Sequence, residues 1–347
     1  MTPSDLSGRP TVADPSGQPS VPDLADLLAS LHVVRLPLRV RFRGIEQREV
    51  ALLRGPSGWG EFAPFVEYPP AEAAAWLAAA VEAGWGEWPA PMRDEVPVNA
   101  TVPAVPAERV PEVLARFGGC TTAKVKVAEP GQTLSDDLDR VAAVREVLGT
   151  AGRIRVDANG AWSVDQAREA VAALGRYGLE YVEQPCAQVA ELAALRRALA
   201  RDRVEVPVAA DESIRKAQDP LEVARREAAD LVVVKVAPLG GVAWALAVVQ
   251  DCGLPAVVSS AIDSSVGIRA GVALAAALPE LPHACGLGTV RLLREDVSGE
   301  PLVPVEGALP VRDPVVDLAA LARHRVEPER ESWWRERLTA THAALTG

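Results

Sequence analysis

Charged residues at the ends of short β-rich runs are the feature that most constrains the fold of this chain. The charged positions are Lys124, Lys126, Asp157, Glu183, Asp211 and Lys235. From Lys126 onward, successive positions are 24 to 31 residues apart. That interval accommodates one strand and one returning helix. The spacing therefore predicts consecutive parallel strands whose ends bring the charges into one site.

Strand and helix patterns alternate from Val96 to about residue 300. The predicted strands are 96–102, 122–128, 153–158, 180–184, 206–211, 231–236, 255–260 and 284–288. The predicted helices include 132–149, 163–177, 188–200, 240–251 and 265–277. Eight strand–helix units in roughly 200 residues indicate a (β/α)8 barrel. A doubly wound sheet is the alternative, but no Gly-x-Gly-x-x-Gly follows the first strand, and too many strands end in a charge.

The remaining segments indicate a smaller α+β unit. Apolar and polar residues alternate between 33 and 65, as in antiparallel strands, and 71–85 has a helical period. The segment 310–347 contains another expected helix, predicted to pack back on this unit. Pro, Ser, Gly and Asp dominate the first residues, which predicts disorder. The expected domains are a tail (1–24), a capping domain (25–95 with 302–347) and a barrel (96–301).

Composition excludes several function classes. The formal net charge of −11 over 347 residues argues against nonspecific binding to nucleic acid or to an anionic membrane. The four cysteines form no CxxC pair, and no signal peptide or membrane-spanning run is evident. We expect a soluble cytoplasmic protein that acts on a small anionic substrate through locally concentrated cations. The oligomeric state stays open.

Strand alternation groups the charged residues by face. Lys124 and Lys126 point the same way, and both can face one cavity. By the same rule, shared faces are expected for Arg155, Asp157 and Asn159, and for Tyr181 and Glu183. Asp211 and Glu212 cannot both point inward, and Asp211 at the strand end is the favoured group.

Three carboxylates at neighbouring strand ends would repel one another without a cation. Oxygen ligands with no His or Cys nearby favour Mg2+, with Mn2+ as a substitute. Together with lysines, such an ion suits removal of a proton α to a carboxylate. Each residue alone has an ordinary reading, as an exposed strand face or a helix N-cap. The conjunction of six at the carboxyl ends of barrel strands favours an active site.

The series KVK, VDANG, VEQP, ADES and KVAPLGG resembles the enolase superfamily, specifically its branch of muconate-lactonizing enzymes and o-succinylbenzoate synthases. The resemblance covers nearly the whole chain. It implies that Lys126 is the base and that Lys235 lies across the substrate. From charge proximity, we further expect Lys124 to lower the pKa of Lys126. The resemblance also implies three metal ligands: Asp157, Glu183 and Asp211.

Within the superfamily, several activities are disfavoured. No His–Asp pair of the mandelate racemase type is present, and no Asp-x-Asp of dipeptide epimerases follows the last strand. Pro238 stands where N-succinylamino acid racemases usually carry Arg. The pattern therefore favours the o-succinylbenzoate synthases, which eliminate water from a cyclohexadiene carboxylate. An N-succinylamino acid racemase and a catalytically silent binding or structural barrel remain the alternatives.

Substrate contacts are expected from the segment SSAIDSSVG at 259–267, through Ser259 and Ser260. Its later serines could equally cap a helix. Further candidate contacts are Arg155 and Asn159. Gly288 stands where the resemblance predicts Asp in a Gly-Leu-Asp-Thr motif. The segment 58–65 resembles a lid loop with Trp59 and Phe62 excluding water, although a plain hairpin turn is equally compatible.

Overall fold

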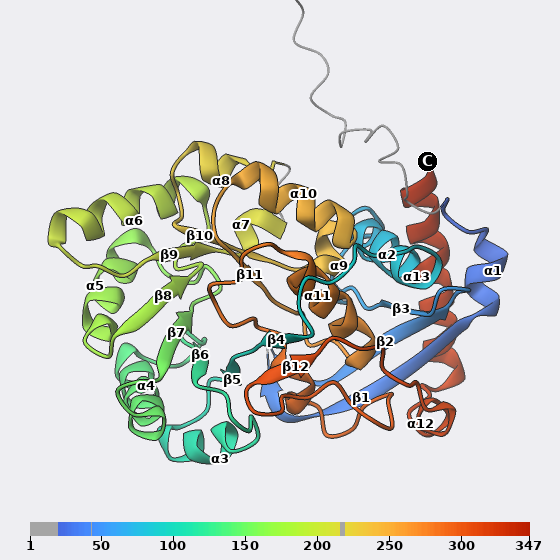
Figure 1. Cartoon of the computed structure of the whole chain (residues 1–347), viewed down its shortest axis with the longest axis horizontal. Coiled ribbons are helices and arrows are strands. Elements are labelled where there is room, and N and C mark those ends of the chain that lie inside the picture. The colour runs from blue at the N-terminus through green and yellow to red at the C-terminus, as the bar shows by residue number, and fades with distance from the viewer. Residues whose placement is uncertain (1–19, 43, 216–218) are drawn as a thin grey trace, which may run out of the picture.

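The computed structural model describes residues 20–42, 44–215 and 219–347. Most of the predicted disordered tail, residues 1–24, lies outside this range. Figure 1 shows two bodies side by side: a small sheet with long helices, and a larger curled sheet surrounded by helices. Helix α11 lies between them in this view. The capping unit therefore stands next to one side of the curled sheet.

The capping unit is an antiparallel sheet covered by helices, as expected for residues 33–65 and 71–85. The strands lie in the order β1-β2-β3. The elements are α1 (Leu24–Ala29), β1 (Leu31–Phe42), β2 (Ile45–Arg54), β3 (Trp59–Phe62), α2 (Pro70–Trp85), α12 (Leu318–Arg323) and α13 (Pro328–Thr346). Helix α13 packs on this unit through Trp334, whose ring meets Phe62 edge-on at 6.0 Å. Residues of α1, β1 to β3 and α2 thus share one apolar core with residues of α13.

The larger unit contains seven parallel strands within the described residues, in the order β11-β10-β9-β8-β7-β6-β5. The strands are β5 (Ala100–Val102), β6 (Thr122–Lys126), β7 (Arg153–Asp157), β8 (Leu179–Glu183), β9 (Val208–Ala210), β10 (Leu231–Val234) and β11 (Ala256–Val258). The intervening helices are η1 (Ala107–Arg109), α3 (Val110–Leu114), α4 (Leu134–Leu148), α5 (Val164–Gly175), α6 (Val189–Asp202), α7 (Glu212–Arg215), α8 (Glu222–Arg225), α9 (Val236–Leu239), α10 (Val242–Cys252), α11 (Ser265–Ala277) and η2 (Gly288–Leu292).

Two predicted strands differ from the structure. The segment 96–102 divides into β4 (Glu95–Pro97), which pairs antiparallel with β12 (Ala308–Pro310), and the parallel strand β5. Pro97 has no N–H to continue a ladder. The segment 284–288 is no strand: Cys285 bridges to Val98 and Gly286 bridges to Ser259 by single contacts. Gly286 and Gly288 weaken a strand at this position, and η2 begins at Gly288.

Local sequence explains where the helices begin. Thr133 and Asp136 form a capping box at the start of α4, and Ser163 and Gln166 form another at α5. Ser264 caps α11 by accepting a hydrogen bond from the Val266 N–H. The N-cap reading of this serine is therefore correct.

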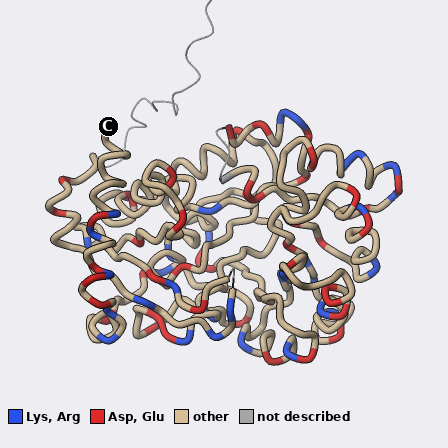
Figure 2. Tube along the Cα trace, turned by 180° about the vertical axis from the view of Figure 1, so that it is seen from behind, with Lys and Arg blue, Asp and Glu red and all other residues tan. Residues whose placement is uncertain are grey.

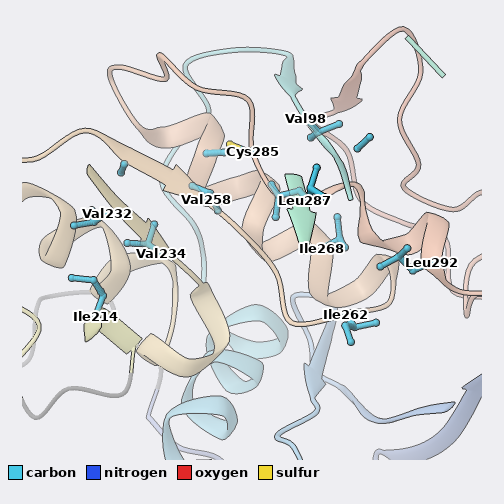
Figure 3. Close-up of a cluster of buried hydrophobic side chains, with 14 of the residues drawn as sticks. Val98, Ile214, Val232, Val234, Val258, Ile262, Ile268, Cys285, Leu287 and Leu292 are labelled. Atoms are coloured by element: carbon cyan, nitrogen blue, oxygen red, sulfur yellow. The ribbon is translucent and has the colours of Figure 1, made fainter. Parts of the chain in front are cut away.

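Branched apolar side chains from the strands and from α11 fill the space between them. Figure 3 shows this cluster, with Val232, Val234 and Val258 from the sheet and Ile268 from α11. All are less than 2% exposed. Burial of each such side chain contributes about 1.5 to 3 kcal/mol. This core holds the strand ends, and with them the charged side chains, in fixed positions.

Charges on the surface are mixed. Figure 2 shows acidic and basic residues interspersed along the outer helices. Within the described residues, no helix is long and apolar enough to cross a membrane. The four cysteines, all in the described part of the chain, have free thiols.

A buried carboxylate of the capping unit joins it to the larger unit. Glu82 on α2 accepts hydrogen bonds from the Val242 and Ala243 N–H groups, at 2.6 and 3.0 Å. These are the first residues of α10, where N–H groups lack partners within the helix. Glu82 also accepts from the Trp88 indole at 3.2 Å. A capping-domain side chain therefore caps a helix of the other unit.

We predict that Glu82→Ala lowers the free energy of unfolding by about 2 kcal/mol, because one buried and two partly buried donors lose their acceptor. Chemical denaturation monitored by circular dichroism measures this. The control is Glu72→Ala, in the first turn of the same helix. Equal stability of wild type and Glu82→Ala would contradict the prediction.

Candidate active site

The register of the parallel sheet brings three of the predicted charged residues level with one another. Lys126 on β6 stands opposite Asp157 on β7, and Asp157 stands opposite Glu183 on β8. Each is the last residue of its strand. Parallel strands with matched ends therefore place an ammonium and two carboxylates in a row at the carboxyl edge of the sheet.

Ion pairs connect the lysines of β6 to these carboxylates. The Lys124 Nζ lies 2.8 Å from Glu183 Oε1 and 3.2 Å from Asp157 Oδ2. Lys126 pairs with the same Asp157 oxygen. Both lysines therefore lie on the same face of the strand and pair with the same carboxylate, as strand alternation predicts. Lys124 and both carboxylates are buried.

A second pair forms at the other side of the curled sheet. Lys235, directly after β10, pairs with Asp211, directly after β9. Gln184 holds this strand end in place: its Oε1 accepts hydrogen bonds from the N–H groups of Asp211 and Ser213, at 2.8 and 3.2 Å. The adjacent Glu212 begins α7 and accepts a hydrogen bond from Asn159. The structure thus places Asp211 inside the cluster.

Burial and ion pairing shift the protonation of the cluster. Burial would raise the pKa of Asp157, but the ammonium groups of Lys126 and Lys124 outweigh it and hold that pKa well below its usual value. Burial would lower the pKa of Lys124, yet Glu183 and Asp157 hold it above its ordinary value. Burial and the neighbouring Asp157 raise the pKa of Glu183 to about 7. The cluster contains three carboxylates and three lysines, and within it burial beside Asp157 favours the protonated form of Glu183.

The carboxylates of the cluster are of the ligand type that a hard divalent cation binds. Within the described residues, no three His, Cys, Asp or Glu side chains converge as a ready-made metal site, and lysine ammonium groups contact each carboxylate. The buried atom Glu183 Oε2 is among those that have no hydrogen-bond partner in the described part of the chain. Carboxylate oxygens without nearby nitrogen or sulfur donors suit Mg2+. The oxygen ligands of Asp157, Glu183 and Asp211 are therefore of the type that this ion binds, although the three side chains are paired with lysines and do not converge on one point in this structure.

Two residues that were predicted to contact the substrate form hydrogen bonds with other residues of the chain. Arg155 is fully buried, and its guanidinium donates to Glu180 at 2.8 Å, Asn99 at 3.2 Å and the Ala284 carbonyl at 2.6 Å. Arg155 lies two residues before Asp157 on β7. Asn159 accepts a hydrogen bond from Lys126 Nζ at 2.7 Å. The structure therefore places Arg155 in an internal network and Asn159 beside the predicted base.

The serines after β11 lie at the junction with the 284–288 segment. Ser259 bridges to Gly286, and the Ser260 hydroxyl donates to the Gly286 carbonyl at 2.9 Å. Ser260 also lies 2.8 Å from the Thr289 hydroxyl. A Cβ at Gly288 would meet the Asn99 carbonyl oxygen at 3.0 Å. The chain has little room there for the Asp that the family motif predicts.

The predicted lid residues do not form a loop in this structure. Residues 59–62 are the strand β3, paired with β2. Phe62 is fully buried against Trp334, and Trp59 packs near His32. Strand pairing and core burial at Trp59 and Phe62 agree with the alternative of a packed turn, and the lid role of the segment 58–65 stays a prediction.

A capping-unit residue that sequence reasoning missed does reach the cluster. The ring of Phe42, at the end of β1, has its centre 5.5 Å from Lys126 Nζ. Its position in an ordinary alternating strand carried no signal of this contact. Phe42 therefore supplies an apolar wall beside the ammonium group of Lys126.

Comparison with known families agrees with the site. Residues 107–314 match the enolase C-terminal domain-like model, and residues 33–84 match the enolase N-terminal domain-like model. The chain belongs to the enolase superfamily.

Relatives within the superfamily share most of this sequence. The chain is 62% identical to the o-succinylbenzoate synthase of Mycolicibacterium smegmatis over 94% of its own length and 99% of the relative. It is 60% identical to the o-succinylbenzoate synthase of Mycobacterium leprae, covering 94% and 95% of the two chains.

Solved structures of the superfamily share the fold. A muconate lactonizing enzyme from Pseudomonas fluorescens, complexed with muconolactone, has a TM-score of 0.72 at 21% identity and covers 86% of this chain and 98% of its own. An N-succinyl Arg/Lys racemase from Bacillus cereus has a TM-score of 0.70 at 19% identity, and the match covers 86% of this chain and 97% of the racemase. The enolase-like fold therefore consists here of an N-terminal capping unit and a curled parallel sheet.

Next to the candidate active site, two buried carboxyl groups meet across the boundary between the two units. Glu61 belongs to β3 of the capping unit, and Asp263 follows β11; they are 7% and 8% exposed. Burial and the neighbouring Asp263 raise the pKa of Glu61 to about 8, although Ser264 and Arg48 act against this shift. Burial also raises the pKa of Asp263. The pair therefore retains a proton at neutral pH.

We predict that this pair makes stability depend on pH. Because the folded pKa of Glu61 lies above the ordinary value of 4.5, the unfolded chain releases this proton first. The contribution of Glu61 to the free energy of unfolding is then fully present below pH 4.5 and falls, by an amount on the order of a few kcal/mol, up to about pH 8. Denaturation of wild type and Glu61→Gln across this range measures the difference. Identical pH profiles for the two proteins would contradict the prediction.

Proposed function

We propose that this chain is an o-succinylbenzoate synthase, a hydro-lyase that removes water from 2-succinyl-6-hydroxy-2,4-cyclohexadiene-1-carboxylate in menaquinone biosynthesis. The observation that carries this proposal is the placement of two lysines four strands apart around a cluster of three buried carboxylates. The 62% identity to a synthase that aligns over nearly its full length supports it. We place the reaction in the cytoplasm.

Lys126 is the proposed proton carrier. In its neutral form, the amine takes the proton from the carbon α to the ring carboxylate. The C–O bond to the ring hydroxyl then breaks, and Lys126 returns the proton so that water leaves. One base on one face of the ring suffices for both transfers, which corresponds to a syn elimination. Asn159 and Phe42 would hold the side chain of Lys126 in place during these steps.

Lys235 and Lys124 have electrostatic roles in this proposal. Lys235 would face the substrate from the other side and stabilise the planar anion by its charge, including a cation–π contact with the ring. Lys124 is already compensated by two carboxylates. We therefore assign it to orienting Asp157 and Glu183, which is a different role from lowering the pKa of Lys126.

Asp157, Glu183 and Asp211 would hold Mg2+, or Mn2+ in its place. When bound, the ion supplies positive charge that stabilises negative charge developing on the substrate carboxylate. We further infer that the curled sheet is a modified (β/α)8 barrel, closed through the bridges at Cys285 and Gly286. In this interpretation the barrel spans residues 96–301, and residues 25–95 with 302–347 form the capping domain.

An N-succinylamino acid racemase activity is the second candidate. Two lysines from opposite sides of a substrate are also suited to removing a proton on one face and returning it on the other. Deuterium exchange at the α-carbon of N-succinylamino acids in D2O, followed by NMR, tests it. Exchange at a rate comparable with dehydration would place both activities in this protein.

We predict that Lys126→Ala lowers kcat for dehydration by at least about 100-fold, because the general base is lost. The assay follows formation of the aromatic product by ultraviolet absorbance. Arg168→Ala, an exposed position on α5, is the control for substitution at a cation away from the site. Full dehydration activity in a folded Lys126→Ala protein would rule out this assignment.

We also predict that EDTA abolishes dehydration and that added Mg2+ or Mn2+ restores it. Calorimetric titration with Mg2+ should give binding to wild type and weaker binding to Glu183→Gln, which loses one anionic ligand. If wild type binds no Mg2+ and turns over no substrate, a silent barrel with a binding or structural role becomes the better interpretation.

A further inference from the structure

The segment after β11 is held by two side chains of the capping unit. Arg48 on β2 donates from Nε to the Ile262 carbonyl at 3.3 Å. Glu61 on β3 accepts from the Ser264 N–H at 3.2 Å, from the Ser264 hydroxyl and from the Gly267 N–H at 3.1 Å. These groups lie on both sides of Asp263. The segment Ser259 to Ser265 is thus fastened at its middle and at its end.

The backbone of this segment is strained. Ile262 has a φ of +63°, in the left-handed region that β-branched residues rarely adopt. Its side chain is only 1% exposed, and Figure 3 shows it at the edge of the apolar cluster that includes Ile268 and Leu292. Strained conformations persist only where surrounding contacts hold them. Arg48 and Glu61 supply two such contacts from another domain.

The same segment borders the candidate active site. Glu61, Asp263, Ser259 and Lys235 line one small cavity between the two units, of about 30 Å³. This volume admits about one water molecule. Ser259 is therefore a neighbour both of the Lys235 side chain and of the capping-unit carboxylate. A shift of the segment would move Ser259 and Ser260 relative to Lys235.

We propose that Glu61 and Arg48 are positioning residues through which the capping unit sets substrate affinity, by holding the segment 259–265 in its strained shape. This role rests on the proposed function and on the expectation from the sequence that Ser259 and Ser260 contact the substrate. Glu61 is not a catalytic residue here, since its carboxylate contacts the backbone and hydroxyl of the segment. The alternative is that Glu61 only joins the two domains, as Glu82 does at α10.

Glu82 provides a matched control for this alternative. Both carboxylates are buried, both belong to the capping unit, and each caps a helix of the larger unit. Only Glu61 contacts the 259–265 segment through these hydrogen bonds. A general effect of domain docking would therefore appear equally in both variants, whereas a positioning effect would appear only at Glu61.

The experiment compares steady-state kinetics of wild type, Glu61→Ala, Glu61→Gln and Glu82→Ala with the cyclohexadiene substrate and Mg2+. For Glu61→Ala we expect KM to rise about tenfold, while kcat changes less than about twofold. Glu61→Gln keeps the side-chain size and one acceptor, and should show a smaller increase. Glu82→Ala should retain the wild-type KM. Calorimetric binding of the product o-succinylbenzoate provides the same comparison for any folded variant that turns over poorly.

The outcomes separate this inference from the proposed function. Absence of turnover by wild type would refute the function, and this role with it. Normal wild-type turnover with an unchanged KM and product affinity in Glu61→Ala would refute the positioning role alone. An equal rise of KM in Glu82→Ala would also refute it, since domain docking would then explain both.

Discussion

The pairing of buried lysines with buried carboxylates is the interaction on which the rest of this structure depends. Removing an ion from water into a protein interior costs several kcal/mol after relaxation. Glu183 and Asp157 hold the pKa of Lys124 above its ordinary value at this depth, and Lys235 forms an ion pair with Asp211. The register of the strands is therefore constrained. A shift of one strand by one residue would turn its charged side chain to the opposite face, where apolar side chains pack.

The turns that follow these strands are strained in a consistent way. Ala128, Asn159, Gln184 and Ile262 all have positive φ, between 37° and 63°. Each lies just beyond a strand of the curled sheet, where the chain leaves the sheet near the charged cluster. Strain of this kind often accumulates at functional sites and is balanced by packing elsewhere. Here the apolar core beneath the strands and the capping unit above them provide that balance.

Much of the fold followed from local patterns. The strand positions and the helices 163–177 and 265–277 were predictable because alternation and helical period are properties of neighbouring residues. That Lys126 and Asp157 end neighbouring strands at one site followed from spacing and from parallel pairing. The strand expected at 284–288 is absent, and residues 59–62 of the segment 58–65 form the paired strand β3, because single bridges and strand pairing depend on which distant segment lies alongside.

By itself, the sequence determined which residues carry charge at strand ends and on which strand face each lies, because these depend on a period of two residues and a repeat of one strand and one helix. Only the tertiary structure decided what those side chains meet. It placed Arg155 against Glu180, Phe42 beside Lys126, and Glu61 on the segment after β11. These contacts join residues far apart in the chain, and their free energy depends on burial that no local pattern encodes.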